Sequence, residues 1–516
     1  MTVVPFRSNA LLRHPLAAGL AALAFSVAAL PGAAQTSVDT SWIQFRKDPA
    51  RRLFPHLPAA LTSGSGAHAP STTLLVTNCE DDGPGSLRAA IAAAADADIV
   101  DLSTLRCGRI TLETGAIPIQ LDNLTLTGPG RSALAIDGND LDRVFLHYGG
   151  GTLTLQNLTV SNGRNRATGF DVAGGGCVAS AGYLYLESST LSGCYAGGEG
   201  AYGGALYAYA LTMSNSTLSG NVAYGVHPGA GTAAFGGAAF VYALQLAAST
   251  VTGNDADHRV NGELPSYDIG GGIVSVLGGI VYNSTIDTNF SQGRGGGIAT
   301  FNNLSLYNST VSGNVAATGI AGGLFLRWPS ALQLNNSTIT ANRAGADGGG
   351  IWLNAPGSTF DSSIVFGNGI EVGNRDNLAN PAAAVSIEGD NNLAGSVAEV
   401  ISLPPDTLRA DPHLLTLAHN GGPTRTHALA AASPAIDAGN NAAGLPFDQR
   451  GADFPRVFGA APDIGAFEQQ GAPPPVVQVP VPTLSGWLSV LLAGLLATLA
   501  LAQGKYRGSG IVRRSA

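Results

Sequence analysis

The middle of the chain is built from short runs in which apolar and polar residues alternate. Leu304-Ser305-Leu306 and Leu332-Gln333-Leu334 are two examples, and a period of two residues is typical of strands that bury one face. A Ser-Thr pair or a near equivalent also returns, at Leu158-Thr159, Ser189-Thr190, Ser216-Thr217, Ser249-Thr250, Ser284-Thr285, Ser309-Thr310, Ser337-Thr338 and Ser362-Ser363. A glycine pair recurs between these sites, at Gly175, Gly204, Gly237, Gly271, Gly296, Gly323 and Gly349.

These signals define a repeating unit of roughly 25 residues with short strands and no helical period, which is typical of one coil of a parallel β-helix. Most units have an asparagine four residues after the Ser-Thr pair, at Asn221, Asn254, Asn289, Asn314 and Asn342, and one unit has Cys194 there. We expect these asparagines to accept a left-handed backbone and their amides to bond to the same residue one coil away. Glycine allows close or positive-φ turns between the faces. The alternative solenoid, a leucine-rich repeat, has a leucine-asparagine consensus that this sequence lacks.

The predicted fold class is all-β: a right-handed parallel β-helix over residues 72–400, continued by residues 401–470. The segment Ser86–Ala97 is predicted to form a short amphipathic helix. Ser86 can cap its start, and Leu87, Ala90, Ile91 and Ala94 share one face. A solenoid needs a cap at its open end, and this helix can supply one.

Composition and charge narrow the classes of protein. Glycine accounts for 70 of 516 residues and charged residues for only 12 %, which argues against helical bundles and coiled coils. An apolar share of 45 % argues against disorder. The net charge is −9. The charged residues of segments 1–34 and 480–516 are all basic, so the net charge of the segment between them is more negative still. A nucleic-acid partner, which needs a basic surface to neutralise phosphates, is not expected.

Residues 1–34 have the plan of a secretory signal peptide. Arg7 and Arg13 precede the apolar run Leu16–Leu30, and Gly32-Ala33-Ala34 suits cleavage after Ala34. A membrane anchor is the alternative, but the apolar run is short for a span. We therefore expect an exported chain in which residues 35–71 form a linker.

The C-terminal end has the plan of a membrane anchor. A Pro-rich linker, residues 471–480, precedes the charge-free stretch Leu484–Ala502, which as a helix is long enough to cross a bilayer core. Trp487 stands where an interfacial aromatic residue belongs. Basic residues follow the stretch and predict a cytoplasmic C-terminus, namely Lys505, Arg507, Arg513 and Arg514.

The tail, residues 481–516, also resembles a known sorting signal. Its opening motif, Val481-Pro482-Thr483-Leu484-Ser485-Gly486-Trp487, is similar to that of the IPTL-CTERM tail of Gram-negative bacteria. Val481 and Gly486 differ from the isoleucine and glutamate that are usual there. The resemblance implies export, membrane retention and processing by a sorting protease of the cell envelope. A permanent single-span anchor is the alternative.

Two stretches of the β-helix region resemble bacterial surface proteins. Residues 76–91 look like the N-terminal coil of right-handed β-helix surface proteins. Motifs spread over residues 411–468 match the choice-of-anchor Q domain: Asp411-Pro412, Asn420-Gly421-Gly422-Pro423-Thr424-Arg425-Thr426-His427-Ala428-Leu429, Ser433-Pro434-Ala435-Ile436-Asp437-Ala438-Gly439, Asp448-Gln449-Arg450-Gly451 and Pro462-Asp463-Ile464-Gly465-Ala466-Phe467-Glu468. The resemblance implies a surface protein whose anchor varies, and it implies no known reaction.

Four cysteines in an exported chain indicate disulfides. Cys79 with Cys107 would staple the capping helix to the first coil. Cys177 and Cys194 lie within one repeat unit, where they either form a second disulfide or stack as small buried hydrophobic residues. The sequence has no Cys-x-x-Cys or His-rich spacing, so we expect neither a metal nor another cofactor.

The pectin-lyase-like β-helix fold also houses pectate lyases and polygalacturonases, which use converging carboxylates. The acids of this chain are mostly isolated. Asp437, Asp448, Asp463 and Glu468 stand among prolines and glycines, where carboxylates commonly accept backbone N–H bonds in turns. We therefore assign no catalytic residue.

Insertions fall on one edge of the predicted β-helix, between a Ser-Thr pair and the next glycine pair. The two longest, residues 222–236 and 255–270, occur in consecutive coils and should be neighbours. Inserts on one face of a solenoid often form its binding face, and acids with tyrosines suit sugar hydroxyls or a cation. The candidate ligand-binding residues are Tyr224, His227, Asp255, Asp257, His258, Arg259, Glu263, Tyr267 and Asp268. A pair of solvated loops without a ligand is the alternative.

The sequence thus predicts an exported, membrane-tethered surface protein of a Gram-negative bacterium, adhesin-like or glycan-binding and non-catalytic. The alternative is a polysaccharide lyase or glycoside hydrolase. Three carboxylates in one cleft would favour the enzyme, and scattered carboxylates would favour binding. The expected partners are the sorting machinery, extracellular polysaccharide and, through the C-terminal helix, the inner membrane.

Membrane retention should depend on the tail. Deleting residues 480–516 removes the apolar stretch and its basic flank, so we expect a soluble, folded protein, because the β-helix closes its own core. Membrane fractionation of the full chain and the truncated chain checks this. If the truncated chain still sediments with membranes, the anchor lies elsewhere.

Overall fold

The computed structural model describes residues 71–167, 172–225, 233–257, 268–327, 329–353, 356–370, 377–379 and 384–470. The predicted signal peptide, linkers and tail, including the sorting motif and its membrane helix, lie outside these ranges. By its internal contacts the chain divides into two compact units, Met1–Gln469 and Gln470–Ala516. The account that follows concerns the first unit.

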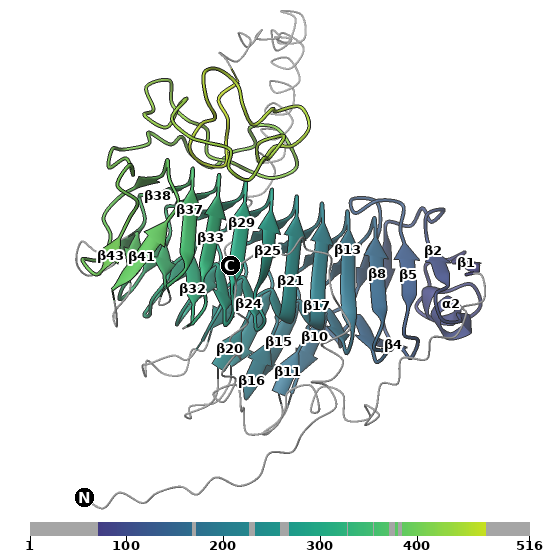
Figure 1. The fold of residues 1–516 in the computed structure, drawn as a ribbon. Helices are drawn as coiled ribbons and strands as arrows, with labels where there is room; N and C mark the ends of the chain where they lie inside the picture. Colours follow the sequence, from purple (N-terminus) through teal and green to yellow (C-terminus); the bar gives the residue numbers. More distant parts are fainter. Residues whose placement is uncertain are drawn as a thin grey trace, which may run out of the picture. The chain divides into compact units, whose positions relative to one another are not determined.

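The described residues form the predicted parallel β-helix (Figure 1). Each strand pairs in parallel with its equivalents in the coils before and after. Thr190 of one coil, for example, lies opposite Thr159 on one side and Thr217 on the other. The strands fall into four sheets, here named A to D, with 21, 11, 8 and 3 strands.

Sheet A carries up to two strands per coil. Its strands are β1 (Thr73–Leu75), β2 (Ile99–Asp101), β4 (Ile117–Ile119), β5 (Leu124–Thr127), β7 (Phe145–His147), β8 (Thr152–Gln156), β12 (Val178–Ser180), β13 (Tyr183–Glu187), β17 (Leu206–Ser214), β21 (Ala239–Ala247), β24 (Ile273–Ser275), β25 (Gly279–Tyr282), β28 (Ile298–Thr300), β29 (Leu304–Tyr307), β32 (Leu324–Leu326), β33 (Leu332–Asn335), β36 (Ile351–Trp352), β37 (Ser358–Asp361), β40 (Leu378–Ala379), β41 (Val385–Glu388) and β43 (Ile401–Ser402).

Sheets B, C and D follow in the other faces of the coils. Sheet B holds β3 (Arg109–Thr111), β6 (Ala135–Asp137), β9 (Thr159–Ser161), β14 (Thr190–Ser192), β18 (Thr217–Ser219), β22 (Thr250–Thr252), β26 (Thr285–Asp287), β30 (Thr310–Ser312), β34 (Thr338–Thr340), β38 (Ile364–Phe366) and β42 (Leu393–Ala394). Sheet C holds β10 (Arg164–Arg166), β15 (Tyr195–Gly198), β19 (Val222–Gly225), β23 (Asp255–Asp257), β27 (Phe290–Ser291), β31 (Val315–Ala316), β35 (Arg343–Ala344) and β39 (Gly369–Ile370). Sheet D holds β11 (Val172–Gly174), β16 (Gly200–Tyr202) and β20 (Ala233–Phe235).

Alternation along each strand places one set of side chains inside the coil stack. In sheet B the inward row is aliphatic in seven consecutive coils and fully buried: Val160, Leu191, Leu218, Val251, Ile286, Val311 and Ile339. Like side chains therefore stack on like side chains along the axis. This stacking is why the period-two pattern of the sequence repeats once per coil.

The predicted asparagine ladder is present. Asn289 Nδ2 donates to Asn314 Oδ1 at 2.9 Å, and Asn314 Nδ2 donates to Asn342 Oδ1 at 2.8 Å. The same bond links Asn221 to Asn254, Asn254 to Asn289, Asn342 to Asn368 and Asn368 to Asn377. Each ladder amide is thus both donor and acceptor inside the stack, where an unpaired polar group would be costly.

The expectation that the ladder asparagines themselves adopt a left-handed backbone is wrong. The left-handed residue is the one before each ladder asparagine, as Gly220 with φ 61° and Gly313 with φ 66° show. A second left-handed corner precedes the Ser-Thr pair and is filled by Asn215 and Asn308 in two of the coils. Glycine and asparagine tolerate this conformation best, so the ladder asparagine itself keeps ordinary backbone geometry.

The Ser-Thr pair has a structural explanation of its own. The serine is buried, and its Oγ accepts the N–H of the equivalent serine in the preceding coil: Ser216 N–H donates to Ser249 Oγ at 3.1 Å. The bond recurs in coil after coil from Ser189 to Ser363. The threonine that follows points outward on sheet B. A second ladder therefore runs beside the asparagine ladder.

The predicted capping helix is present as α2 (Leu87–Ala93), shorter at its end than the pattern suggested. Ser86 is its N-cap, and its Oγ accepts the N–H of Ala89 at 3.2 Å. Leu87 and Ile91 are buried against the first coils. The helix covers the N-terminal end of the coil stack (Figure 1), as predicted.

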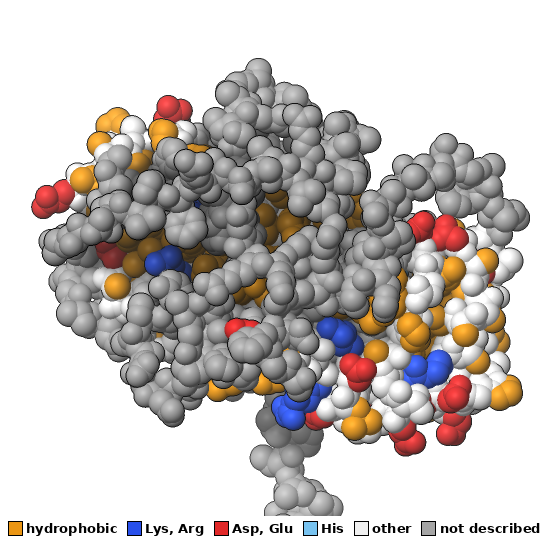
Figure 2. Space-filling view, turned by 90° about the horizontal axis from the view of Figure 1, so that it is seen from below, with side chains coloured by type: hydrophobic (Ala, Val, Ile, Leu, Met, Phe, Trp, Pro, Cys, Tyr) orange, Lys and Arg blue, Asp and Glu red, His pale blue; other side chains and the backbone are white. Residues whose placement is uncertain are grey.

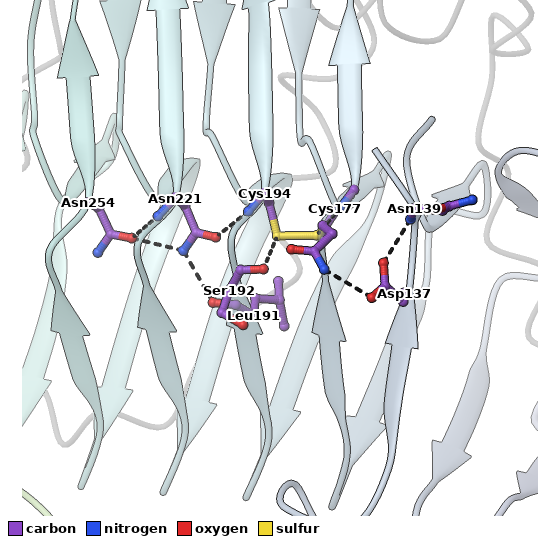
Figure 3. The surroundings of a disulfide bond; sticks show 10 residues. Asp137, Asn139, Cys177, Leu191, Ser192, Cys194, Asn221 and Asn254 are labelled. Carbon is purple, nitrogen blue, oxygen red and sulfur yellow. Dashed lines mark hydrogen bonds between the residues drawn. A yellow bond between two sulfur atoms is a disulfide. The ribbon is translucent and has the colours of Figure 1, made fainter. Parts of the chain in front are cut away.

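Both cysteine pairs form disulfides. Cys79 is bonded to Cys107, with 6.4 Å between the Cα atoms, and Cys177 to Cys194, with 5.4 Å. The second pair replaces a ladder element: Cys194 stands at the ladder position, and its N–H donates to Asn221 Oδ1 at 3.0 Å (Figure 3). The amide ladder thus ends at a covalent bond across one coil, which decides between the two alternatives for this pair.

Residues 403–469 follow the last strand and lie along the outer face of sheet B. Thr310 Oγ1 donates to Gln449 Oε1 at 2.6 Å, and Ser312 Oγ lies 2.8 Å from His427 Nε2. The backbone also joins this interface, since Gly465 N–H donates to Ser362 O at 2.8 Å. No strand longer than an isolated bridge occurs among the described residues after β43. Figure 1 shows these loops beside β37 and β38.

Replacing Asn314 by leucine should break the ladder at two bonds. Asn314 is fully buried, so its neighbours Asn289 and Asn342 would each lose a partner inside the stack. We expect the free energy of unfolding to fall by about 1–3 kcal/mol, measured by urea unfolding. Asn302→Leu is the matched control, because that half-buried side chain bonds to the adjacent Asn303 N–H outside the ladder. Equal losses in the two variants would contradict the ladder's contribution.

Candidate functional site

The structure describes four of the nine candidate ligand-binding residues. Tyr224 lies in β19, Asp255 and Asp257 lie in β23, and Asp268 follows the second insertion. The other five candidates lie outside the described residues: His227, His258, Arg259, Glu263 and Tyr267.

The described ends of the two insertions are strands that continue the coil stack. β19 pairs with β23 so that Tyr224 lies opposite Asp257 and Val222 opposite Asp255. Residues 233–235 of the first insertion form β20. The coils are wider here because sheet D is added to sheet C. The patch is therefore set by strand register, with neighbouring strands about 4.8 Å apart.

Asp268 does not belong to the surface patch. Its side chain is fully buried, and its Oδ1 accepts the N–H of Ala234 in β20 at 2.7 Å. Its backbone O accepts the N–H of Arg294 from the next coil. This carboxylate therefore holds the end of sheet D in place.

Two further residues join the patch. Tyr195 in β15 lies beside Tyr224 with 6.5 Å between ring centroids and 27° between ring planes. The Arg164 guanidinium in β10 lies over the Tyr195 ring at 4.4 Å. We call Arg164, Tyr195, Tyr224, Asp255 and Asp257 the sheet C strip. The sequence held a signal for the two additions: Arg164 and Tyr195 stand in the same register position as Val222 and Asp255.

The strip changes charge along the solenoid axis. Its first strand carries Arg164, its middle strands carry tyrosines, and β23 carries Asp255 and Asp257. Arg164 Nη1 also lies 3.3 Å from Asp140 Oδ1. Burial raises the pKa of the Tyr195 phenol, and the nearby Arg164 guanidinium partly opposes this. Asp255 is half-buried and Asp257 is 5 % exposed, so Asp255 is the more accessible acid.

Packing limits the sugar stacking expected of the tyrosines. Arg164 covers one face of the Tyr195 ring, and Tyr224 lies on its other side. An aromatic ring binds a sugar through an open face. Tyr195 therefore offers a ligand its edge and hydroxyl, and the strip suits hydrogen bonding better than stacking.

A second aromatic group fills the corner between sheets D and A. Tyr202 stacks on Phe235 at 5.1 Å, and Tyr207 stacks on Phe240 at 5.7 Å. These four residues are at most 5 % exposed. The corner packs sheet D against sheet A.

Hydrophobic side chains gather in the middle of the face seen from below in Figure 2, whereas charged side chains are mixed among the others at the end with the N-terminal coils.

The carboxylates near the C-terminal end accept backbone N–H bonds, as their turn-rich surroundings predict. Asp437 Oδ1 accepts from Ala460 at 2.8 Å, and Asp463 Oδ1 accepts from Asp437 at 2.8 Å. Asp448 Oδ2 accepts from Glu468 N–H at 2.8 Å and pairs with Arg450. Each of these acids thus has a structural task in the segment over sheet B.

Glu468 is the most perturbed of these acids. It is fully buried, accepts the N–H groups of Phe458 and Asp463, and pairs with Arg456 at 2.7 Å. Burial raises the pKa of its carboxyl from 4.5 to about 7, and the Arg456 guanidinium opposes the rise. Removing the carboxyl from water outweighs its attraction to the arginine.

Two properties of the described residues bear on function. Within them, no three His, Cys, Asp or Glu side chains form a group that could hold a metal ion. No helix in the described ranges is long and apolar enough to cross a membrane.

No protein-family model and no curated protein matches this chain. A solved structure titled "Crystal structure of pectate lyase Pel9A" is similar in fold, with a TM-score of 0.38 and 13 % sequence identity over 78 % of this chain and 98 % of that chain. The likeness concerns the fold alone, which the strand pairing of this chain already establishes.

Glu468 should make stability depend on pH. A folded-state pKa raised from 4.5 to about 7 means that the folded chain binds this proton more tightly than the unfolded chain. The contribution of the Glu468 carboxyl to the free energy of unfolding is therefore fully present below pH 4.5 and is lost as the pH rises to about 7. Glu468→Gln should remove this component, so the stability of the wild type relative to the variant should fall between pH 5 and pH 8.

Urea unfolding of both proteins at several pH values measures this difference. His147 and His427, whose pKa values burial lowers, are present in both proteins and cancel in the comparison. Parallel pH profiles for the wild type and the variant would show that Glu468 does not titrate in this range.

Proposed function

We propose that this chain is an exported, membrane-tethered surface protein that binds extracellular polysaccharide without cleaving it. The observation that carries the proposal is the sheet C strip, in which Arg164, Tyr195, Tyr224 and the pair Asp255 and Asp257 stand on four consecutive strands. Hydroxyl, carboxylate and guanidinium groups on adjacent strands are the groups that bond to sugar hydroxyls. The strip lies on the wider coils, which contain the two longest insertions and the added sheet D.

Export is supported by the two disulfides, because such bonds persist in oxidising compartments. The proposed localisation at the cell surface rests on three sequence features: the signal peptide, the choice-of-anchor Q motifs and the IPTL-CTERM-like tail. Under this proposal the sorting machinery of the cell envelope and the inner membrane are the partners of the tail. The β-helix then presents its outer faces outside the cell.

Binding is favoured over catalysis by the placement of the acids. Asp255 and Asp257 share one strand, whereas Asp437, Asp448, Asp463 and Glu468 hold backbone groups in another part of the fold. A polysaccharide lyase or glycoside hydrolase needs its carboxylates to converge on one bond. The strip holds two described carboxylates, Asp255 and Asp257, and both lie on one strand. An enzyme is therefore the second candidate.

Asp255→Asn with Asp257→Asn should abolish glycan binding and leave the melting temperature unchanged. The amides keep the shape of the side chains and remove the charge that attracts sugar hydroxyl donors. A glycan-array screen of the exported chain in mild detergent, wild type against double variant, measures the effect. Glu113→Gln with Glu399→Gln removes two charges from exposed positions elsewhere and is the control.

Full binding by the double aspartate variant would refute the strip as the site. A parallel assay for unsaturated or reducing sugar ends tests the second candidate. Release of such ends by the wild type, lost in the double variant, would establish an enzyme instead.

A further inference from the structure

The outer face of sheet B carries two straight rows of hydroxyl groups. The three-residue strands β9, β14, β18 and β22 belong to four consecutive coils, and their first and third residues point outward. The first residue of each strand is threonine, and the third is serine or threonine. The rows are Thr159, Thr190, Thr217 and Thr250, and Ser161, Ser192, Ser219 and Thr252. Partners in a row are one strand spacing apart, about 4.8 Å.

This uniformity is peculiar to sheet B. In the same coils the outward positions of sheet A include Gln156, Glu187 and Ser214, and those of sheet C include Arg164, Tyr195 and Asp255. Threonine favours exposed strands in general, but that preference acts on all three sheets alike. A separate constraint therefore acts on the outer face of sheet B.

Both ends of the threonine row already hold polypeptide by the same bond. At one end Thr159 Oγ1 donates to Arg131 O at 2.7 Å. Past the other end, in the next coil after Thr250, Thr285 Oγ1 donates to Arg425 O at 2.6 Å. Beyond Thr285, residues 403–469 cover the face. The hydroxyls of this row are thus placed to bond to oxygen acceptors of a chain lying across the strands.

An open stretch remains between the two covered ends. We call it the hydroxyl bay: Thr190, Ser192, Thr217, Ser219 and Thr250. All five residues are half-buried. Within the described residues the hydroxyls of Thr190, Thr217 and Thr250 form no hydrogen bond. The bay is continuous with the interface that holds the C-terminal segment, and along one edge the exposed Arg131 side chain reaches to Asn215, whose backbone O accepts from its guanidinium at 2.6 Å.

The period of the bay selects the kind of chain that can occupy it. An extended polypeptide places carbonyls of one side about 6.6 Å apart, two residues of rise, which does not match the strand spacing of the bay. The rise per sugar of an extended β-linked glycan is of the same order as the strand spacing of about 4.8 Å, so successive sugars stay near successive coils over the three coils of the bay. The side chains of the bay itself are uncharged, and the Arg131 guanidinium at its edge already bonds to Asn215 O, so an uncharged sugar matches the bay better than an acidic one.

We propose that the hydroxyl bay binds a neutral, extended polysaccharide along the solenoid axis, with one sugar per coil over Thr190, Thr217 and Thr250. Their hydroxyls donate to sugar oxygens as Thr159 and Thr285 donate to carbonyl oxygens. This site is separate from the sheet C strip and does not depend on it.

The bay can be tested with insoluble neutral polysaccharides, microcrystalline cellulose and chitin, as probes of the exported full-length chain. Thr217→Lys places a long charged side chain in the middle of the bay, and we expect retention to fall at least tenfold. Thr212→Lys is the matched control: Thr212 is a half-buried, outward threonine of the same coil, but on sheet A. Equal melting temperatures for the two variants confirm folding, and Thr190→Lys replaces Thr217→Lys if the latter fails to fold.

Retention that is lost in Thr217→Lys and kept in Thr212→Lys supports the proposal. Equal retention of the two variants, or no retention of the wild type on either polysaccharide, overturns it. Retention on ice but on neither polysaccharide also overturns it and assigns the bay to a crystalline water surface. If Asp255→Asn with Asp257→Asn loses retention while Thr217→Lys keeps it, the sheet C strip stands and the bay fails.

Discussion

Parallel hydrogen bonding from coil to coil is the constraint on which the rest of this structure depends. Once one coil sits over the next in register, every position acquires a column of equivalents about 4.8 Å apart. Columns inside the stack must be apolar or must satisfy their own hydrogen bonds. The aliphatic row of sheet B meets the first condition, and the serine and asparagine ladders meet the second.

The same constraint organises the outside. A side chain on an outer face touches its neighbours along the column, so chemistry accumulates in lines. Arg164 and Tyr195 share one such column on sheet C, and Tyr224 packs diagonally on Tyr195 from the next strand. The threonines form another column on sheet B. The C-terminal segment uses the second line as its binding surface through Thr285 and Thr310. An outer face whose residues repeat from coil to coil, because the coils pair in register, thereby offers a partner a regular surface.

The segment over sheet B is stabilised by a different principle. Its described residues pair only through isolated bridges. Beside a small apolar cluster that includes Leu429 and Ile464, it buries charged groups: Arg456 is fully buried with Glu468, and the Arg450 guanidinium lies 3.8 Å from the Phe454 ring centre and 3.9 Å from that of Phe467. Buried ion pairs contribute little net stability but lose much when one partner is removed. They define a single arrangement, and the raised pKa of Glu468 makes that arrangement sensitive to pH.

The sequence alone determined what repeats. Alternation, the Ser-Thr pair and the ladder asparagines depend on local backbone and on identical neighbours, so a one-dimensional pattern predicts the coil, its core and the capping helix. Only the tertiary structure decided what depends on register between coils or on distant segments. It paired Cys177 with Cys194, placed Tyr224 opposite Asp257, buried Asp268 under sheet D and laid Thr310 against Gln449. The contact of Tyr224 with Asp257 follows the coil period, but its exact register does not appear in the sequence. The contact of Thr310 with Gln449 joins residues whose spacing carries no period, and only the closed stack brings them together.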